Sequence, residues 1–243
     1  PVFSVVGNHD VGGGVGIEYY QSYLGPTHYA FDHGGRHFVI INCVGLLDAQ
    51  YNWLERELAL QPKEKEIYLF QHYPPDARLM ALLAPFNVKA IYSGHWHSSK
   101  FFSTGPNGIK SVNSPSLSFG GIDVSPRGFR ITTFAGGKMT LESRAGGVKG
   151  QFLLISSPAD HPIPRGLLAI EVSLYDSATD VSRVTAQLDN GQWRPLTVAG
   201  SFTWAGKATT KPGKHILRVR AELKDGTVLN QQRDFTVGNH QVL

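Results

Sequence analysis

The sequence predicts two domains, an α/β domain followed by an all-β sandwich. Short apolar strands alternate with amphipathic helical segments in the first part of the chain. In the second part, every predicted element alternates apolar and polar residues with a period of two, and no helical stretch interrupts the pattern. Glycines gather between the two patterns, at residues 145–150. We therefore place the domains at residues 1–148 and 149–243.

The first domain is predicted to contain short buried strands and one clear helix. The strands expected are residues 2–6, 29–31, 36–42, 67–70 and 88–92, followed by an antiparallel pair at residues 128–134 and 138–143. A helix is expected after Asp48, a good N-cap residue, because Tyr51, Leu54 and Leu58 recur at helical spacing. A second, shorter helix is expected at residues 79–83.

The second domain has the strand pattern of an immunoglobulin-like β-sandwich. Leu217, Val219 and Ala221 point one way, whereas Arg218 and Arg220 point the other. Hairpin turns are expected at residues 189–191 and 225–226. The Cys–Trp–Cys pattern of antibody domains is absent, so the sequence predicts the architecture alone.

Composition excludes several classes of protein. Lysine and arginine are scattered along the chain, giving a net charge of +4 without a basic run interleaved with aromatic residues. A nucleic-acid groove is therefore not expected. The single cysteine, Cys43, excludes an internal disulfide bond and a cysteine-rich zinc site, and a buried thiol is expected there. The apolar stretches reach about seven residues, far below the roughly 20 that a membrane span needs.

Three short segments carry the residues suited to chemistry. They are Gly7-Asn8-His9-Asp10, Gln71-His72 and Gly94-His95-Trp96-His97, and each follows a predicted apolar strand. In an open α/β sheet, ligand sites gather at the carboxyl ends of the strands. Singly, the first segment is also compatible with an ordinary turn and His72 with a satisfied histidine at the edge of the core. Together they predict one cluster of an asparagine and four histidines.

In this order, the three segments resemble the last three signature motifs of the calcineurin-like metallophosphoesterases. The similarity covers about residues 1–143 and is closest to the acid phosphatase and phosphodiesterase subgroup, including residues 29–32 and Trp53-Leu54. The resemblance implies an α/β sandwich of metallophosphoesterase type. It also implies that Asn8, His72 and His95 bind one metal ion and that His97 binds another. His9 would protonate the leaving oxygen, and Asp10 would orient His9.

The resemblance further implies hydrolysis of small phosphate mono- or diesters. Two divalent ions, such as Mn, Fe or Zn, would clamp the phosphoryl group and lower the pKa of a bridging water. The resulting hydroxide attacks phosphorus in line while a histidine acid assists departure of the leaving group.

The sequence departs from the family pattern at its start. The family's Asp-x-His and Gly-Asp-x-x-Asp/Asn motifs belong upstream of Gly7, so the domain is predicted to be N-terminally truncated. We expect a further N-terminal segment or a second chain to complete it. The alternative is a non-catalytic phosphoesterase fold whose sandwich binds a protein or a glycan. The appended sandwich also suggests an extracytoplasmic location, periplasmic or secreted.

Two further features leave alternatives open. Residues 113–118 either line the substrate pocket or form an ordinary Ser/Pro loop. Trp193 and Trp204 either form a sugar-binding platform or pack within the sandwich.

Overall fold

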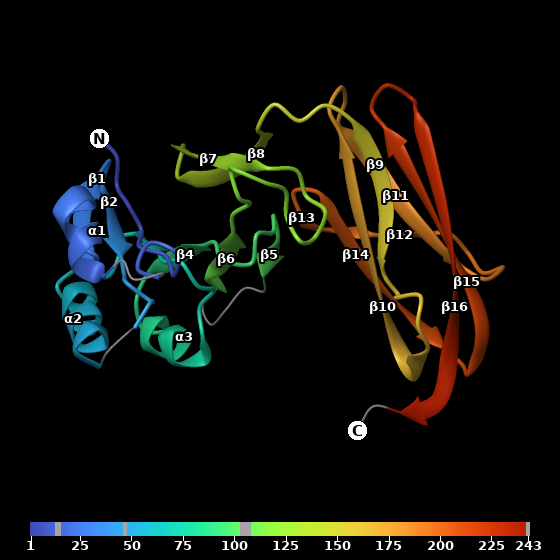
Figure 1. Cartoon of the computed structure of the whole chain (residues 1–243), viewed down its shortest axis with the longest axis horizontal. Helices are drawn as coiled ribbons and strands as arrows, with labels where there is room; N and C mark the ends of the chain where they lie inside the picture. The colour runs from blue at the N-terminus through green and yellow to red at the C-terminus, as the bar shows by residue number, and fades with distance from the viewer. Residues whose placement is uncertain (13–15, 46–47, 103–107, 242–243) are drawn as a thin grey trace. The chain divides into compact units, whose positions relative to one another are not determined.

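The structure, a computed structural model, describes residues 1–243 except 13–15, 46–47, 103–107 and 242–243. The chain forms two compact units (Figure 1). The first comprises Pro1–His97 and Phe101–Ser114, and the second comprises Ser98–Lys100 and Pro115–Leu243. No helix among the described residues is long and apolar enough to cross a membrane.

The first unit is built on a six-stranded mixed sheet. Its strands are β1 (Tyr29–His33), β2 (Arg36–Ile40), β3 (Ile67–Phe70), β4 (Val88–Ser93), β5 (Phe101–Phe102) and β6 (Lys110–Asn113), and its helices are α1 (Ile17–Leu24), α2 (Asp48–Ala59) and α3 (Ala77–Leu83). The strand order is β1-β2-β3-β4-β6-β5. β1 and β2 form the predicted hairpin, whereas β2, β3, β4 and β6 run parallel. The carboxyl ends of four strands therefore share one edge of the sheet.

One face of this sheet packs against α2 and α3. Val39, Leu69 and Ile91 are register partners on adjacent strands, and all three are buried in one apolar cluster. The same cluster contains the buried leucines of the two helices, namely Leu54, Leu58, Leu79 and Leu83. Asp76 caps α3, because its carboxylate accepts the Leu79 N–H at 2.8 Å. Both predicted helices are thus confirmed.

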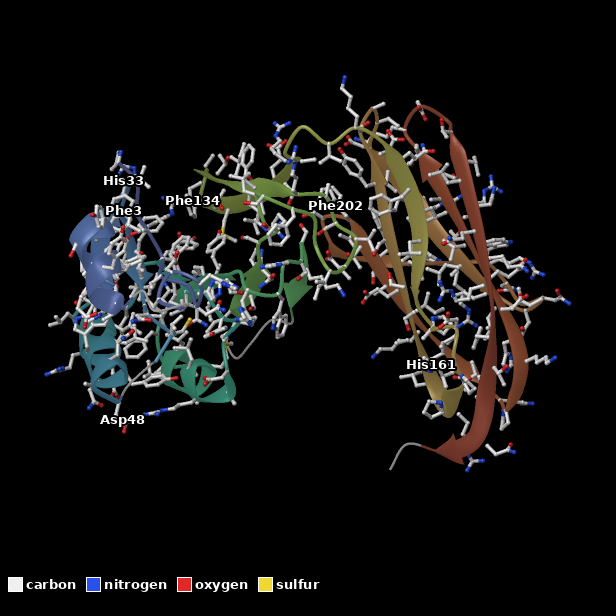
Figure 2. All side chains as sticks on the ribbon, viewed as in Figure 1. Phe3, His33, Asp48, Phe134, His161 and Phe202 are labelled. Carbon is white, nitrogen blue, oxygen red and sulfur yellow. The ribbon has the colours of Figure 1, made fainter. Side chains whose placement is uncertain are left out.

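A row of aromatic rings crosses the opposite face of the sheet. Ring centroids are 5.2 Å apart for Phe31 and Phe38, 6.4 Å for Phe38 and Phe70, and 4.8 Å for Phe70 and Tyr92. Phe3, labelled in Figure 2, stacks on Phe31 at 4.0 Å and extends the row past β1. Apolar side chains therefore occupy both faces, which is typical of parallel strands.

The prediction of a strand at residues 2–6 was wrong. These residues join no sheet, although Val6 is fully buried. Side-chain contacts anchor them, such as the Tyr29 hydroxyl that donates to Ser4 O at 2.9 Å. An apolar run indicates that a segment is buried. A buried segment becomes a strand only if a neighbouring strand offers free backbone groups for pairing.

The second unit is made of β-strands. They are β7 (Gly128–Ala135), β8 (Lys138–Ala145), β9 (Gln151–Ser157), β10 (Ile163–Asp176), β11 (Val181–Leu188), β12 (Arg194–Pro195), β13 (Thr197–Gly200), β14 (Thr203–Thr210), β15 (Gly213–Leu223) and β16 (Val228–Gln241). β7 and β8 form the predicted antiparallel pair, and the remaining eight strands belong to one sheet. Hairpins occur at the two predicted turns, between β11 and β12 and between β15 and β16.

β10 links two layers of this larger sheet. Most of its length pairs with β14 and β9, whereas Ile163 and Arg165 pair in parallel with β16. β16 continues the ladder to β15, β11 and β12. One apolar cluster draws buried side chains from both parts, including Val172 and Trp204 from one and Leu217 from the other. This arrangement is consistent with the predicted β-sandwich, while its immunoglobulin type stays a prediction.

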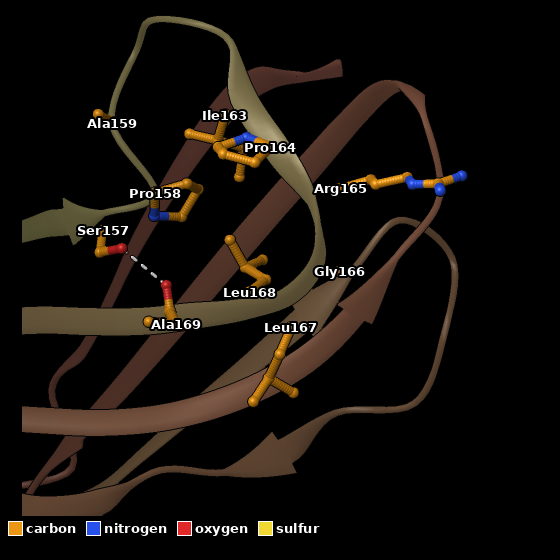
Figure 3. A pocket seen from close by; sticks show the side chains of 10 residues that line it. All are labelled: Ser157, Pro158, Ala159, Ile163, Pro164, Arg165, Gly166, Leu167, Leu168 and Ala169. Carbon is orange, nitrogen blue, oxygen red and sulfur yellow. Dashed lines mark hydrogen bonds between the residues drawn. The ribbon is translucent and has the colours of Figure 1, made fainter. Parts of the chain in front are cut away.

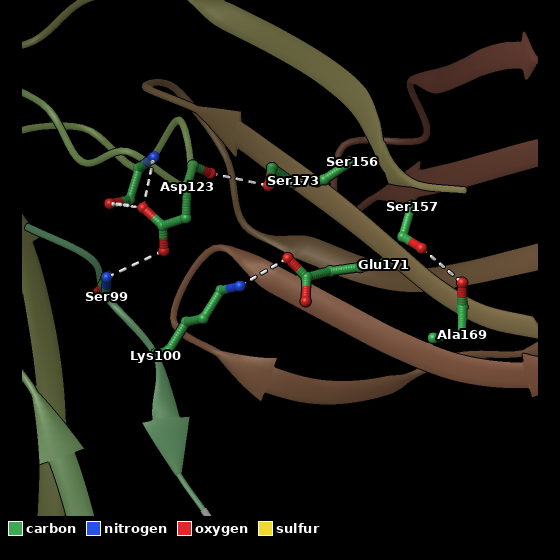
Figure 4. A network of polar contacts seen from close by, with 9 residues as sticks. Ser99, Lys100, Asp123, Ser156, Ser157, Ala169, Glu171 and Ser173 are labelled. Carbon is green, nitrogen blue, oxygen red and sulfur yellow. Dashed lines mark hydrogen bonds and ion pairs between the residues drawn. The ribbon is translucent and has the colours of Figure 1, made fainter. Parts of the chain in front are cut away.

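A buried carboxylate fastens residues 98–100 within the second unit (Figure 4). Asp123 accepts the Ser99 N–H at 3.0 Å, the Ser125 N–H at 3.1 Å and the Ser125 hydroxyl at 2.5 Å. The Ser173 hydroxyl donates to the Asp123 carbonyl oxygen at 2.8 Å. Lys100 adds an ion pair with Glu171 at 2.6 Å. The three bonds from Ser99 and Ser125 satisfy the Asp123 carboxylate, which is almost fully buried.

The domain boundary predicted at residues 148/149 lies inside the second unit. The large sheet begins just after it, since β9 starts at Gln151. The β7–β8 hairpin precedes the boundary but is grouped with the second unit by compactness. The ranges 1–148 and 149–243 therefore remain a prediction.

Candidate metal centre

Two of the predicted histidines follow neighbouring parallel strands. His72 comes directly after Gln71 at the end of β3, and His95 follows Gly94 at the end of β4. Because Phe70 is the register partner of Tyr92, the two strand ends meet at the same edge. The Gly94 N–H donates to the His72 carbonyl oxygen at 2.9 Å, which ties the two segments together.

Asn8 reaches this edge from a tight turn. The Asp10 N–H donates to Gly7 O at 3.1 Å, and Asp10 Oδ2 accepts the Gly7 N–H at 2.7 Å. The turn places Asn8 Oδ1 2.6 Å from His72 Nε2, and that nitrogen lies 3.2 Å from His95 Nδ1. Three atoms of metal-ligand type, from three separate segments, therefore meet around His72 Nε2.

The spacing of these atoms fits one divalent ion. Metal–nitrogen bonds of about 2.0–2.1 Å put neighbouring ligand atoms about 3.0–3.4 Å apart in tetrahedral or octahedral geometry. The 3.2 Å between the two imidazole nitrogens lies in that range, and the 2.6 Å to Asn8 is a few tenths of an ångström shorter. Imidazole nitrogen and amide oxygen suit Mn, Fe or Zn. Asn8, His72 and His95 are therefore compatible with three ligands of a single ion.

The environment of His72 favours the neutral imidazole. Burial lowers the pKa of His72, and the nearby His95 lowers it further, whereas Asp10 opposes the shift. A neutral ring is the form that binds a metal ion. The electrostatics of the cluster thus agree with its geometry.

Glycine at position 7 permits the close approach of His72. A Cβ atom added to Gly7 would lie 3.0 Å from His72 Nδ1 and 3.1 Å from His72 Cε1. Contacts this short are tighter than ordinary van der Waals packing, so a larger residue would push the ring aside. Gly7 therefore sets the position of the ring that stands at the centre of the cluster.

His97 is not a third ring in this cluster. It is half-buried and close enough to contribute to the lowered pKa of His72. Within the described part of the chain, no group of three or more His, Cys, Asp or Glu side chains is arranged to hold a metal ion. The assignment of His97 to a second ion therefore stays a prediction. Both histidines have a positive φ, which is 41° for His97 and 62° for His95. Non-glycine residues in this region are uncommon and gather at functional sites.

His9 and Asp10 are exposed beside the cluster. Both influence the pKa of His72, with His9 lowering it and Asp10 raising it. Asp10 uses Oδ2 to close the turn at Gly7. The roles predicted for them, a proton donor and its orienting carboxylate, stay predictions.

Asn113 and Tyr73 also lie at this edge, and the sequence assigned neither to metal binding. Asn113 is fully buried, and its carboxamide donates to Ser93 Oγ at 3.2 Å and to the carbonyl oxygen of Gly94. The ring of Tyr73 packs edge-on against His95 at 4.4 Å. The signal that marks the other site residues is missing for Asn113, because its strand reads Lys-Ser-Val-Asn and is not an apolar run. Asn113 supports the chain beneath the site. The sequence had offered only a pocket lining or an ordinary loop for residues 113–118.

Cys43 lies on the flank of the same edge. The Tyr73 N–H donates to its sulfur at 3.0 Å, and burial raises the pKa of the thiol. Cys43 is only partly buried, so the expectation of a buried thiol is met in part.

A surface pocket lies elsewhere, within the second unit (Figure 3). It has a volume of about 470 Å³ and lies between Ser157 and Ala169, where the Ser157 hydroxyl is already bonded to Ala169 O at 2.7 Å. Its lining exposes polar and apolar atoms about equally, and Arg165 is the one ionisable residue of that lining. Its lining contains no acid–base pair, so the histidine cluster is the better candidate for a reaction site.

The two tryptophans of the second unit differ in exposure. Trp204 is buried in the core, whereas Trp193 is 43% exposed.

Comparison with known proteins agrees with the histidine cluster. Residues 1–99 match the family model of calcineurin-like phosphoesterases. The matched range includes all the residues predicted for the site: Asn8, His9, Asp10, His72, His95 and His97. This part of the chain is therefore similar to a family of metal-dependent phosphoesterases.

Comparison with solved structures gives weaker likenesses. The fibronectin(III)-like modules of Clostridium thermocellum CbhA share 17% identity, cover 37% of this chain and 100% of their own, and give a TM-score of 0.31. CopC from Methylosinus trichosporium OB3b shares 16% identity over 39% of this chain and 99% of its own, with a TM-score of 0.28. The endo-β-1,4-mannanase from Thermotoga petrophila shares 10% identity over 78% of this chain and 43% of its own, with a TM-score of 0.35. No curated protein sequence matches the chain. Scores this low carry no argument about function.

Proposed function

We propose that this chain carries part of a metal-dependent hydrolase of small phosphate mono- or diesters. The observation that carries the proposal is the meeting of Asn8 Oδ1, His72 Nε2 and His95 Nδ1 at one sheet edge. The family similarity of residues 1–99 supports the same chemistry.

Each residue has a distinct task in this proposal. Asn8, His72 and His95 hold one divalent ion, and His97 contributes to a second. Divalent ions such as Mn, Fe or Zn supply Lewis-acid polarisation of the phosphoryl oxygens and charge neutralisation. The exposed His9 faces the ester and donates a proton from its imidazole to the departing alkoxide. Asp10, next in the chain, orients the His9 ring.

The test is metal analysis combined with a panel of phosphate esters. The chain should bind Mn²⁺ or Zn²⁺, and replacing His72 or His95 by Ala should abolish most of that binding. His33 provides a matched control, since it is an exposed histidine at the end of β1. His33→Ala should keep the wild-type affinity. Equal metal binding by the His72→Ala and His33→Ala variants would contradict the proposal.

The ligand set also supports a second candidate, a non-catalytic phosphoesterase fold. The three atoms that meet are neutral donors, and no carboxylate joins them among the described residues. In this candidate the sandwich binds a protein or a glycan. Metal binding without turnover of any ester, in this chain and in a longer form of the protein, would favour it over the hydrolase.

The same neutral ligand set motivates a proposal about missing partners. We propose that carboxylate ligands come from an additional N-terminal segment or from a second chain. We also propose an extracytoplasmic location, which cell fractionation would test. If an additional N-terminal segment supplies the carboxylate ligands, a longer form of the protein should bind more metal per chain than this one.

A further inference from the structure

The segment that carries His95 is held in a strained turn. The Trp96 N–H donates to Gly94 O at 2.7 Å, which closes a three-residue turn with His95 at its centre. The φ angle of His95 is 62°, and a γ-turn with a positive central φ is rare and strained. Such conformations persist where the surrounding structure holds them in place.

The neighbouring strand β6 keeps this turn in place through Asn113. Asn113 ends β6, opposite Ser93 at the end of β4, and none of its side chain is exposed. Its Nδ2 donates to Gly94 O, the same oxygen that closes the turn, and also approaches Ser93 Oγ at 3.2 Å. The next residue reinforces the link, because the Ser114 N–H donates to Ser93 O at 2.7 Å.

Both backbone polar groups of Gly94 are therefore held. Its N–H donates to the His72 carbonyl oxygen, just after β3, and its carbonyl oxygen accepts from Asn113 on β6. Rotation of the Gly94–His95 peptide group would move the His95 ring away from His72 Nε2. A carboxamide suits the position, because it donates to a carbonyl oxygen without introducing a charge into a buried place.

We infer that Asn113 is a positioning residue, which fixes the turn at Gly94 so that His95 Nδ1 faces His72 Nε2. The inference rests on the proposed metal site for its functional meaning. Asn113 itself touches neither the ion nor the ester. Its effect is transmitted through one backbone carbonyl to the orientation of one imidazole ring.

Two variants and a control test this inference on the whole chain. Asn113→Ala removes the carboxamide, and Asn113→Asp keeps its shape while placing a carboxylate oxygen against Gly94 O. Ser111→Ala is the matched control, since Ser111 is buried on the same strand and its hydroxyl has no partner among the described residues. Calorimetric titration with Mn²⁺ or Zn²⁺ should show affinity 10–100-fold weaker for both Asn113 variants. Ser111→Ala should match the wild type.

A structural readout separates this inference from the proposed function. The histidine ring resonances of His95 should shift in the metal-free Asn113 variants and stay unchanged in Ser111→Ala. Unchanged His95 resonances together with unchanged metal affinity would overturn the positioning role. A wild-type chain that binds no metal would instead overturn the proposed function, and the His95 resonances would still decide the role of Asn113. If Asn113→Ala does not fold, the near-isosteric Asp variant gives the same comparison.

Discussion

The amide oxygen of Asn8 lies 2.6 Å from Nε2 of His72, across 64 positions of sequence. This contact joins a turn outside the sheet to the end of a core strand. The position of the His72 ring in this contact depends on Gly7, because the Gly7 backbone lies directly against that ring. The first prediction tests that dependence.

Gly7→Ala should weaken metal binding without unfolding the chain. The new methyl group would stand 3.0–3.2 Å from three atoms of the His72 imidazole, so the ring must move by a few tenths of an ångström. Misplacing a ligand or its support typically costs 10–100-fold in metal affinity. Calorimetric titration with Mn²⁺ or Zn²⁺ measures the change. Gly94→Ala is the comparison, because its added methyl would approach His72 no closer than 3.9 Å. A larger loss in Gly94→Ala than in Gly7→Ala would contradict this account.

Much of this edge could be predicted from the sequence, for a simple physical reason. Residues 67–70 form a continuous apolar run, and residues 88–92 are apolar except for Lys89, which is the pattern of parallel strands buried on both faces. The polar residues that follow such runs must lie at the carboxyl edge of the sheet. The proximity of His72 and His95 follows from that rule, and the register of β3 and β4 agrees with it.

Other parts of the site depend on packing that no local pattern reports. Residues 2–6 look like a strand because they are apolar, yet Asn8 is presented by a turn that Asp10 closes. The support from Asn113 crosses between strands and uses a backbone carbonyl, which has no sequence signature. α1 was also not predicted, because it is short, buries only Tyr20 and begins after Gly16, which offers no capping side chain.

Replacing Asp123 should destabilise the second unit. Its buried carboxylate accepts three hydrogen bonds, and Asp123→Ala would leave the Ser99 and Ser125 donors without their acceptor. We expect a loss of about 3 kcal/mol in the free energy of unfolding, since a buried unsatisfied group costs about 1–3 kcal/mol. Urea unfolding measures it. Asp160→Ala, at an exposed aspartate of the same unit, should change stability by less than about 0.5 kcal/mol.

The stability of the sandwich should depend on pH through His215. Its hydrogen bond to Asp189, 2.8 Å long, raises the pKa of His215, while partial burial opposes the shift. A raised pKa stabilises the fold fully below the unfolded value of about 6.5, and the gain disappears as pH rises through the folded pKa. The pair should contribute roughly 0.2–1 kcal/mol. Unfolding of His215→Gln, followed by tryptophan fluorescence, should therefore differ more from wild type at acidic than at alkaline pH.

The exposed His161 supplies the control for that experiment. The difference in unfolding free energy between His161→Gln and wild type should be the same at both pH values. A pH-independent difference for His215→Gln as well would mean that His215 contributes by packing on Phe235, at a ring distance of 5.5 Å, and not by its charge.

The role proposed for His9 can be separated from metal binding by the choice of substrate. His9→Ala should leave bound metal nearly unchanged, because its ring is exposed and lies outside the three meeting atoms. In the metal-loaded protein, turnover of esters with poor leaving groups should fall about 10²–10⁴-fold, the usual cost of a lost general acid. Nitrophenyl esters should lose least, because a nitrophenolate departs without protonation. An equal loss for both kinds of ester, or a loss of metal from His9→Ala, would reassign His9 to phosphate orientation or to metal binding.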